Sequence, residues 1–462
     1  MLERGDKMVE EIVKNTEKYT LNHSKGTRKA KGQFFTPASI ASFMGTRASV
    51  ISRHISILEP GAGNGLLTAS LVKYYIEYGL CRSFSVTFIE NDPDILHVLR
   101  ATADLLKKYV ERHGGHIQVS IDDTNYLLMT DEYQYDVVIC NPPYKKVRKD
   151  SAESIAMSEY VFGQPNLYTL FMCKAVNNLK RGGNFIFITP RSWVSGNYYK
   201  VARKFLLNNL NLTELVLFTD RNNVFVGEDV LQETLITVAT KDKIQDSIIS
   251  IKACAGEIDD AIQLEVQSKI IKNVGQDDYL LLPTSEAEIA TVDKIMSFPD
   301  TFESLGYRFK TGPVVEFRNE SFLSEEKKNG YVPMYRPSNV VNGKCVFPVK
   351  SRKAQYVDGS VGTLLLPNAN TVFLKRITSK EEPRRLQSCV YRRTGDAPYI
   401  SVENHVNYLV RTDGKDLSAD EIGWINDVLM SDEYDLFYRI INGSTQVNVS
   451  EINKLPLQRR IS

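Results

Sequence analysis

Apolar positions follow two different spacings between residues 30 and 240. Short runs rich in β-branched residues, such as ISILE (55–59) and YDVVIC (135–140), predict buried strands. Longer segments with helical spacing, such as 66–78 and 94–113, predict amphipathic helices. Because strands and helices alternate, we predict an α/β fold with a mostly parallel, doubly wound sheet and helices on both faces. Ligands of such sheets bind at the carboxyl ends of the strands.

The alternation fades after about residue 245, where the apolar runs shorten and glycine and proline become more frequent. A chain of 462 residues is also too long for one typical core. We therefore predict a helical N-terminal arm (1–30), the α/β domain (31–245), a connecting region (246–285) and a second, irregular α/β domain (286–462). No apolar run approaches the length of a membrane span, so we expect a cytoplasmic protein that does not contact a membrane.

The net charge of +1 conceals a basic window. Between residues 341 and 394 there are 11 Lys and Arg residues but only 3 Asp and Glu residues. Such an excess favours a polyanionic partner such as nucleic acid, with a solvated surface as the competing explanation. The six cysteines are scattered without CxxC spacing, which indicates buried thiols and no metal site.

Polar residues gather where the predicted strands end. The first strand ends in EPGAGNG (59–65), whose alternate glycines permit a tight turn and close approach of the backbone to a ligand. The second ends in Glu90 and Asn91, where an acidic side chain can accept hydrogen bonds from both hydroxyls of a ribose. The third ends in Asp122 and Asp123, either of which can accept a hydrogen bond from an exocyclic amine. Each motif alone fits an ordinary loop, but together they favour a site for an adenosine-containing cofactor.

The fourth strand stops at Asn141-Pro142-Pro143-Tyr144, because two consecutive prolines cannot donate hydrogen bonds to a sheet. The side-chain oxygen of Asn141 and the carbonyl of Pro142 are acceptors, and Tyr144 offers a flat ring for stacking. This combination suits a planar group that carries an NH2, such as adenine. An electrophile that reacts with this amine would lie at the neighbouring strand ends, where the cofactor is expected. Four basic residues follow within five positions and predict phosphate contacts: Lys145, Lys146, Arg148 and Lys149.

In this order the motifs resemble those of gamma-class DNA adenine-N6 methyltransferases. The residues that carry the resemblance are GQFFTP (32–37), the glycine loop, IEND (89–92), NPPY (141–144), a TaqI-like stretch (165–194) and NVFVGEDVLQETLITVAT (223–240). The C-terminal part resembles the target-recognition regions of PstI- and BsuBI-type modification methylases more loosely, through residues 311–318, 373–385 and 442–457. The resemblance implies a Rossmann-like methyltransferase sheet followed by an α/β target-recognition domain that binds DNA.

The resemblance also implies an activity: site-specific transfer of a methyl group from S-adenosylmethionine to the N6 amine of an adenine flipped out of duplex DNA. The enzyme would belong to a restriction–modification system, would need no metal, and would be a monomer or weak dimer. Any cognate endonuclease would be a separate chain.

The same resemblance implies roles for individual residues. The implied cofactor-binding residues are Thr36, Pro37, Glu59, Gly61, Gly63, Glu90, Asn91, Asn141 and either Asp122 or Asp123. The implied catalytic residues are Asn141, Pro142, Pro143 and Tyr144. Asn141 and Pro142 would bind the target amine, and Tyr144 would stack on the target base with Phe225 as the opposing wall. Contacts to DNA are expected from Lys145, Lys146, Arg148, Lys375, Arg376, Lys380, Arg384, Arg385, Arg392 and Arg393.

Two other enzyme classes use the same tetrapeptide chemistry, because they also modify a planar NH2. An RNA adenine-N6 methyltransferase is the nearer alternative, and a protein-glutamine methyltransferase is the second. GQFFTP and the basic C-terminal part argue against glutamine as the substrate. A third alternative is a DNA-binding subunit without turnover, against which the glycine loop, Glu90 and NPPY argue.

Overall fold

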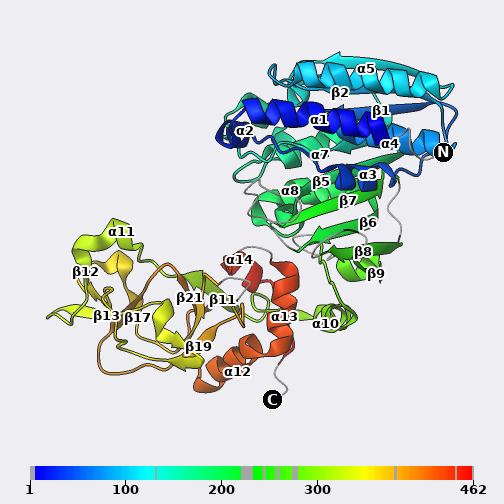
Figure 1. Ribbon diagram of the computed structural model, residues 1–462. Coiled ribbons are helices and arrows are strands. Elements are labelled where there is room, and N and C mark those ends of the chain that lie inside the picture. The colour runs from blue at the N-terminus through cyan, green and yellow to red at the C-terminus, as the bar shows by residue number, and fades with distance from the viewer. Residues whose placement is uncertain are drawn as a thin grey trace. The chain divides into compact units, whose positions relative to one another are not determined.

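The computed structural model describes residues 6–130, 133–219, 233–242, 246–254, 258, 261–272, 279–378, 382–442 and 445–459. The chain divides into two compact units, residues 1–284 and residues 285–462 (Figure 1). Across the described residues, no helix has both the length and the apolar character that a membrane crossing requires.

A nine-stranded sheet with the order β3-β2-β1-β4-β5-β7-β6-β8-β9 forms the centre of the first unit. Strands β1 to β5 run parallel, and β7 is antiparallel to both of its neighbours. The strand order reverses between β1 and β4, and this reversal creates a ligand crevice at the carboxyl ends. The strands are β1 (Ile55–Pro60), β2 (Ser83–Ile89), β3 (His116–Asp122), β4 (Tyr135–Cys140), β5 (Leu179–Pro190), β6 (Asn211–Phe218), β7 (Thr234–Thr240), β8 (Ile248–Cys254) and β9 (Ile262–Gln267).

The predicted α/β class and the Rossmann-like methyltransferase sheet are therefore confirmed. Alternate residues of β4 face opposite sides of the sheet, and both Val137 and Val138 are fully buried. Burial on both faces is typical of a parallel strand covered by helices. The helices of this unit are α1 (Asp6–Asn22), α2 (Lys25–Lys31), α3 (Ala38–Gly45), α4 (Leu66–Glu77), α5 (Leu96–Arg112), α6 (Ala152–Ala156), α7 (Leu167–Asn177), α8 (Lys200–Asn209) and α9 (Ser268–Ile271).

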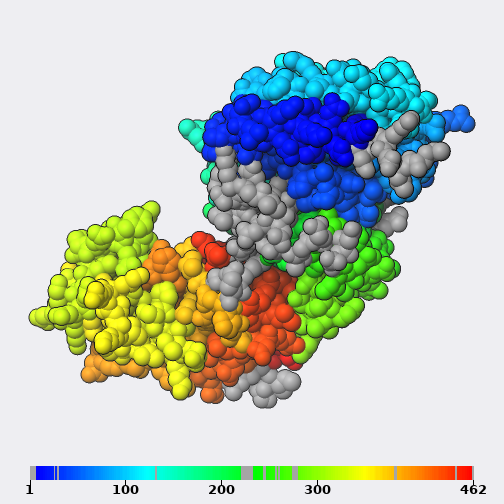
Figure 2. Space-filling view, in the orientation of Figure 1, coloured from blue at the N-terminus to red at the C-terminus, as the bar shows by residue number. Residues whose placement is uncertain are grey.

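Helix α1 is part of the domain core, whereas the sequence predicts a polar arm. Met8, Ile12 and Tyr19 are buried because their spacing places them on one face of the helix. Met8 and Ile12 belong to the same hydrophobic cluster as β1 and β4. In the space-filling view α1, in dark blue, lies directly against the cyan α5 segment (Figure 2).

The segment 246–285 also differs from its predicted role as a connecting region. Strand β8 pairs with β6 in parallel, and β9 pairs with β8, so both strands extend the main sheet. Ile249 and Ile251 of β8 are fully buried, and their β-branched side chains suit this position.

The second unit contains a six-stranded sheet (β11-β21-β18-β19-β15-β14), a five-stranded sheet (β12-β16-β13-β20-β17) and the pair β10-β22. The strands are β10 (Asp300–Thr301), β11 (Tyr307–Thr311), β12 (Leu323–Ser324), β13 (Tyr331–Tyr335), β14 (Val340–Val341), β15 (Gly343–Cys345), β16 (Tyr356–Asp358), β17 (Leu366–Pro367), β18 (Thr371–Lys375), β19 (Ser388–Tyr391), β20 (Tyr399–Val402), β21 (Val406–Arg411) and β22 (Pro456–Leu457). The helices are α10 (Glu286–Met296), α11 (Glu316–Asn319), α12 (Ala419–Met430), α13 (Asp432–Ile441) and α14 (Val449–Ile452). Tyr335, Phe373 and Tyr391 contact one another in its core.

Candidate active site

The loop after β1 needs its glycines for two reasons. Gly61, Gly63 and Gly65 have φ angles of 63°, 54° and 72°, in the left-handed region that side chains disfavour. A Cβ atom on Gly65 would also lie 2.9 Å from Cδ1 of Leu99. The backbone N–H of Gly63 donates to Oε2 of Glu90 at 2.8 Å, which ties this loop to the end of β2.

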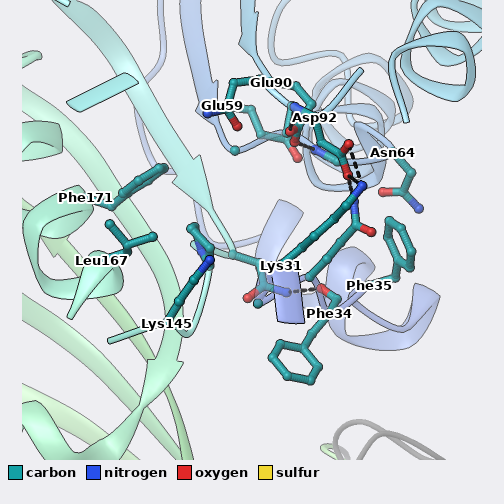
Figure 3. A pocket seen from close by; sticks show the side chains of 18 of the residues that line it. Lys31, Phe34, Phe35, Glu59, Asn64, Glu90, Asp92, Lys145, Leu167 and Phe171 are labelled. Atoms are coloured by element: carbon teal, nitrogen blue, oxygen red, sulfur yellow. Dashed lines mark hydrogen bonds and ion pairs between the residues drawn. The ribbon is translucent and has the colours of Figure 1, made fainter. Parts of the chain in front are cut away.

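A cavity of about 380 Å³ lies beside this loop, at the carboxyl ends of β1, β2 and β4 (Figure 3). Its volume is within the range of small-molecule sites. Several residues with predicted roles line it: Thr36, Glu59, Gly61, Gly63, Glu90, Asn91, Asn141, Pro143 and Lys145. Others were not singled out from the sequence, among them Lys31, Phe35, Asp92, Asn125, Glu153, Leu167 and Phe171. Pro37 does not line the cavity and instead precedes the first residue of α3.

The polar residue after β3 that lines the cavity is not one of the two predicted aspartates. Among the described residues, neither Asp122 nor Asp123 lines the cavity, and Oδ1 of Asp122 accepts a hydrogen bond from the Thr124 backbone. Asn125 lines the cavity instead, and its Nδ2 donates to Oε1 of Glu153 at 3.0 Å. One feature of the sequence could have indicated Asn125: it immediately precedes the apolar Tyr126, and Asn favours the start of a turn.

Two buried carboxyl groups belong to the cavity wall. Glu59 is 2% exposed, and burial raises its pKa to about 8 despite a hydrogen bond from the Thr68 backbone. Burial also raises the pKa of Glu90, which accepts hydrogen bonds from the backbones of Gly63 and Asp92. Because a buried carboxylate is costly without a counter-charge, this pair favours a ligand that carries positive charge.

The end of β4 holds Asn141 in a defined orientation. Nδ2 of Asn141 donates to the backbone carbonyl of Phe34 at 2.9 Å and to Oγ1 of Thr36 at 3.0 Å. A backbone carbonyl can only accept, so the amide nitrogen must face Phe34. Among the described residues no hydrogen bond reaches Oδ1 of Asn141 or the carbonyl of Pro142, and both remain available as acceptors.

Tyr144 is held by a contact to the sheet. Its hydroxyl donates to the carbonyl of Ile188 on β5 at 3.2 Å, and its ring centroid lies 5.5 Å from that of Phe34. Phe225, the expected partner in stacking, lies outside the described residues. Lys145, Lys146 and Arg148 are exposed, as phosphate contacts require.

The basic residues predicted to contact DNA from the second unit fall into two groups. Arg392 and Arg393 are exposed, whereas Lys375 and Arg376 are half-buried and donate to Gln387 and to the carbonyl of Asn404. Lys380 lies outside the described residues.

Arg384 and Arg385 hold the second unit together. Arg384 pairs with Asp432 and with the carbonyl of Ser431. Arg385 is 0% exposed, and its Nε donates to Oγ1 of Thr378. The prediction that Arg385 contacts DNA is therefore wrong, because its guanidinium is enclosed by the fold.

The sheet order, the antiparallel β7 and the glycine loop beside a cavity define the fold class: a Rossmann-like sheet of the kind found in class I methyltransferases. Residues 92–225 match the family model described as "Eco57I restriction-modification methylase".

Relatives match nearly the whole chain. It is 29% identical to "Type II methyltransferase M.PstI" from Providencia stuartii, over 93% of this chain and 87% of the relative. It is also 29% identical to "Type II methyltransferase M.BsuBI" from Bacillus subtilis, over 96% of this chain and 90% of the relative. These matches confirm the predicted resemblance to PstI- and BsuBI-type modification methylases.

A solved structure shares the fold at low sequence identity. The nuclease-deletion mutant of the Type ISP restriction-modification enzyme LlaGI, in complex with a DNA substrate mimic, matches with a TM-score of 0.52 and 12% identity. The match covers 88% of this chain and 52% of that one.

Proposed function

We propose that this protein is the DNA methyltransferase of a restriction–modification system and that it methylates the N6 amine of adenine in duplex DNA. The observation that carries the proposal is the orientation of Asn141, whose two Nδ2 hydrogens are bound by Phe34 and Thr36. Its Oδ1 is left for a donor beside the cavity. The similarity to M.PstI and M.BsuBI along the chain supports DNA as the substrate.

The cavity residues fit S-adenosylmethionine, the cofactor that the methyltransferase fold implies. Bound there, this cofactor supplies an electrophilic methyl group on a positively charged sulfur. Glu59 provides negative charge for its cationic groups, Glu90 accepts hydrogen bonds from its ribose hydroxyls, and Gly61 and Gly63 allow the backbone to approach it closely. The aromatic side chains of Phe35 and Phe171 supply apolar walls.

The residues of NPPY act on the target amine. Oδ1 of Asn141 and the carbonyl of Pro142 accept its two hydrogens, so its lone pair is directed away from them. The same two oxygens stabilise the positive charge that develops on the nitrogen during transfer. Tyr144 stacks on the extruded base, and its hydroxyl bond to Ile188 fixes the plane of the ring.

Neighbouring residues steady the DNA strand from which the base is taken. Lys145 and Lys146 are exposed immediately after the tetrapeptide. The backbone of Lys145 accepts a hydrogen bond from Leu167 at 2.9 Å, which fixes the start of this basic segment. Phosphate contacts at this place hold the nucleotides that flank the target without specifying their sequence.

The proposal is tested by incubating the protein with S-adenosylmethionine and unmodified genomic DNA. The DNA is then digested to nucleosides for mass spectrometry, and modified positions are mapped by sequencing. We expect N6-methyladenine at one recurring motif, and at least about 10²-fold slower methylation with Asn141→Ala. Methylated cytosine, or DNA without new methyl groups, would refute the proposal; parallel reactions with RNA test the nearest alternative.

A further inference from the structure

Residues 31–37, which we call the strap, run along the cavity between its cofactor end and the catalytic tetrapeptide. At one end Nζ of Lys31 contacts Oδ1 and Oδ2 of Asp92, both at 2.8 Å, and Oδ2 of Asp94 at 2.7 Å. Figure 3 shows the long Lys31 side chain reaching toward Asp92, which follows Glu90 by two positions. The strap is thereby fixed to the loop that carries Glu90.

The rest of the strap, from Gly32 to Thr36, lies against the tetrapeptide. The carbonyl of Gly32 accepts a hydrogen bond from the backbone of Tyr144 at 3.4 Å. Gly32 has a φ angle of 72°, and a Cβ atom there would lie 3.3 Å from the Tyr144 nitrogen. Phe34 and Thr36 then bind both Nδ2 hydrogens of Asn141. The close approach of the backbones explains why glycine is required at this position.

The strap also contacts the glycine loop. A Cβ atom on Gly63 would lie 3.6 Å from the ring of Phe35, and the Phe35 ring packs edge-on against Tyr19 of α1 at 5.9 Å. The seven residues therefore contact the ends of β1, β2 and β4. A segment fixed at all three strand ends holds its carbonyl and hydroxyl groups at set positions.

We infer that Thr36 is a positioning residue for methyl transfer: its hydroxyl, with the carbonyl of Phe34, orients the Asn141 amide so that Oδ1 faces the target amine. This inference rests on the proposed function. Thr36 is 8% exposed, so water does not readily replace its hydroxyl as the acceptor. Without Oγ1 of Thr36 one Nδ2 hydrogen loses its partner, and the amide gains freedom to turn away from the amine.

Thr36→Val removes the acceptor and keeps the shape, whereas Thr36→Ser keeps the acceptor. We expect Thr36→Val to lower kcat by about 3- to 12-fold, the range that one hydrogen bond supports, while the KM for DNA stays within about twofold. Thr36→Ser should recover most of kcat. Thr20→Val is the matched control, since among the described residues the Thr20 hydroxyl bonds within α1, to the carbonyl of Glu17.

A double-mutant cycle separates positioning from a general structural effect. If Thr36 acts through Asn141, then Thr36→Val costs nothing further in an Asn141→Ala background. Equal losses of kcat in both backgrounds, with an active wild type, would overturn the inference. A wild type that does not methylate adenine would instead overturn the proposed function.

The orientation of Asn141 has a readout that does not depend on turnover. With selective ¹⁵N-asparagine labelling, the Asn141 side-chain NH2 signal is assigned by its loss in Asn141→Ala. We expect slow hydrogen exchange at this group in the wild type and in Thr36→Ser, and exchange at least several-fold faster in Thr36→Val. Unchanged exchange in Thr36→Val would refute the role of Thr36, whatever the substrate is.

Discussion

Glu59 carries a carboxyl group that the ligand-free protein keeps largely protonated at neutral pH. Its pKa of about 8 lies well above the ordinary 4.5, because burial disfavours the charged form. Between these two values the folded chain binds a proton more tightly than the unfolded chain. The free energy of unfolding therefore falls as the pH rises from about 4.5 to about 8.

Glu59→Gln replaces this group by a neutral one of the same shape. Each pKa unit corresponds to about 1.4 kcal/mol. Between low pH and pH 7 the wild type therefore loses about 3 kcal/mol of its free energy of unfolding, and the variant does not. At pH 5 the two proteins should differ by less than about 1 kcal/mol, since pH 5 lies only about half a unit above the ordinary pKa of the unfolded-state carboxyl. We expect Glu59→Gln to unfold several degrees higher than the wild type at pH 8 and close to it at pH 5.

The assay is thermal unfolding of the ligand-free proteins by scanning calorimetry at pH 5, 7 and 8. Glu77→Gln, which neutralises a carboxylate on the exposed side of α4, is the matched control. The same substitution should weaken S-adenosylmethionine binding at least tenfold, because it removes a counter-charge. A melting difference that is equal at pH 5 and pH 8, or undiminished cofactor affinity, would refute the assignment of Glu59.

Three further outcomes follow from the contacts of other residues. Asn141→Ala should bind S-adenosylmethionine within about twofold of the wild type yet lose about 10²-fold or more in kcat, measured with labelled methyl groups; wild-type turnover would contradict its role as an amine acceptor. Arg392→Glu with Arg393→Glu should weaken DNA binding and reduce the slope of log K against log salt by about 2, measured by anisotropy; an unchanged slope would remove both from the interface. Arg385→Ala should instead lower the melting temperature, because its side chain is 0% exposed, and leave that slope unchanged; a reduced slope with normal melting would restore it as a DNA contact.

The main sheet and its ligand edge could be predicted because local patterns determine them. Strands such as β1 and β4 are short apolar runs that end in residues unable to continue a ladder, and the glycine loop and NPPY mark those ends. The parallel arrangement then brings residues 59, 90 and 141 to one edge without further information. Their proximity around one cavity follows from topology alone.

The direction of individual side chains could not be predicted, because it depends on contacts between distant segments. Lys31 meets Asp92 across 61 positions, and no pattern within either segment indicates the pair. Arg385 belongs to a basic cluster in sequence, yet Asp435 on α13, 50 positions away, binds its backbone and helps to enclose it. Asn125 lines the cavity, and Asp122 and Asp123 do not, for a similar reason: the path of the chain after β3 decides which polar group reaches the cavity.

The strap adds an order of events to the synthesis of this protein. Thr36 and Asn141 are 105 positions apart, so the residue that orients the acceptor leaves the ribosome long before the acceptor itself. Their bond needs β4 in place, since the pairing of β4 with β1 brings Asn141 to the edge where the strap lies. A nascent or truncated chain that ends before residue 141 contains Glu59 and Glu90 but lacks the amine acceptor that we propose. On the proposed function, methyl transfer therefore requires the centre of the sheet to be assembled.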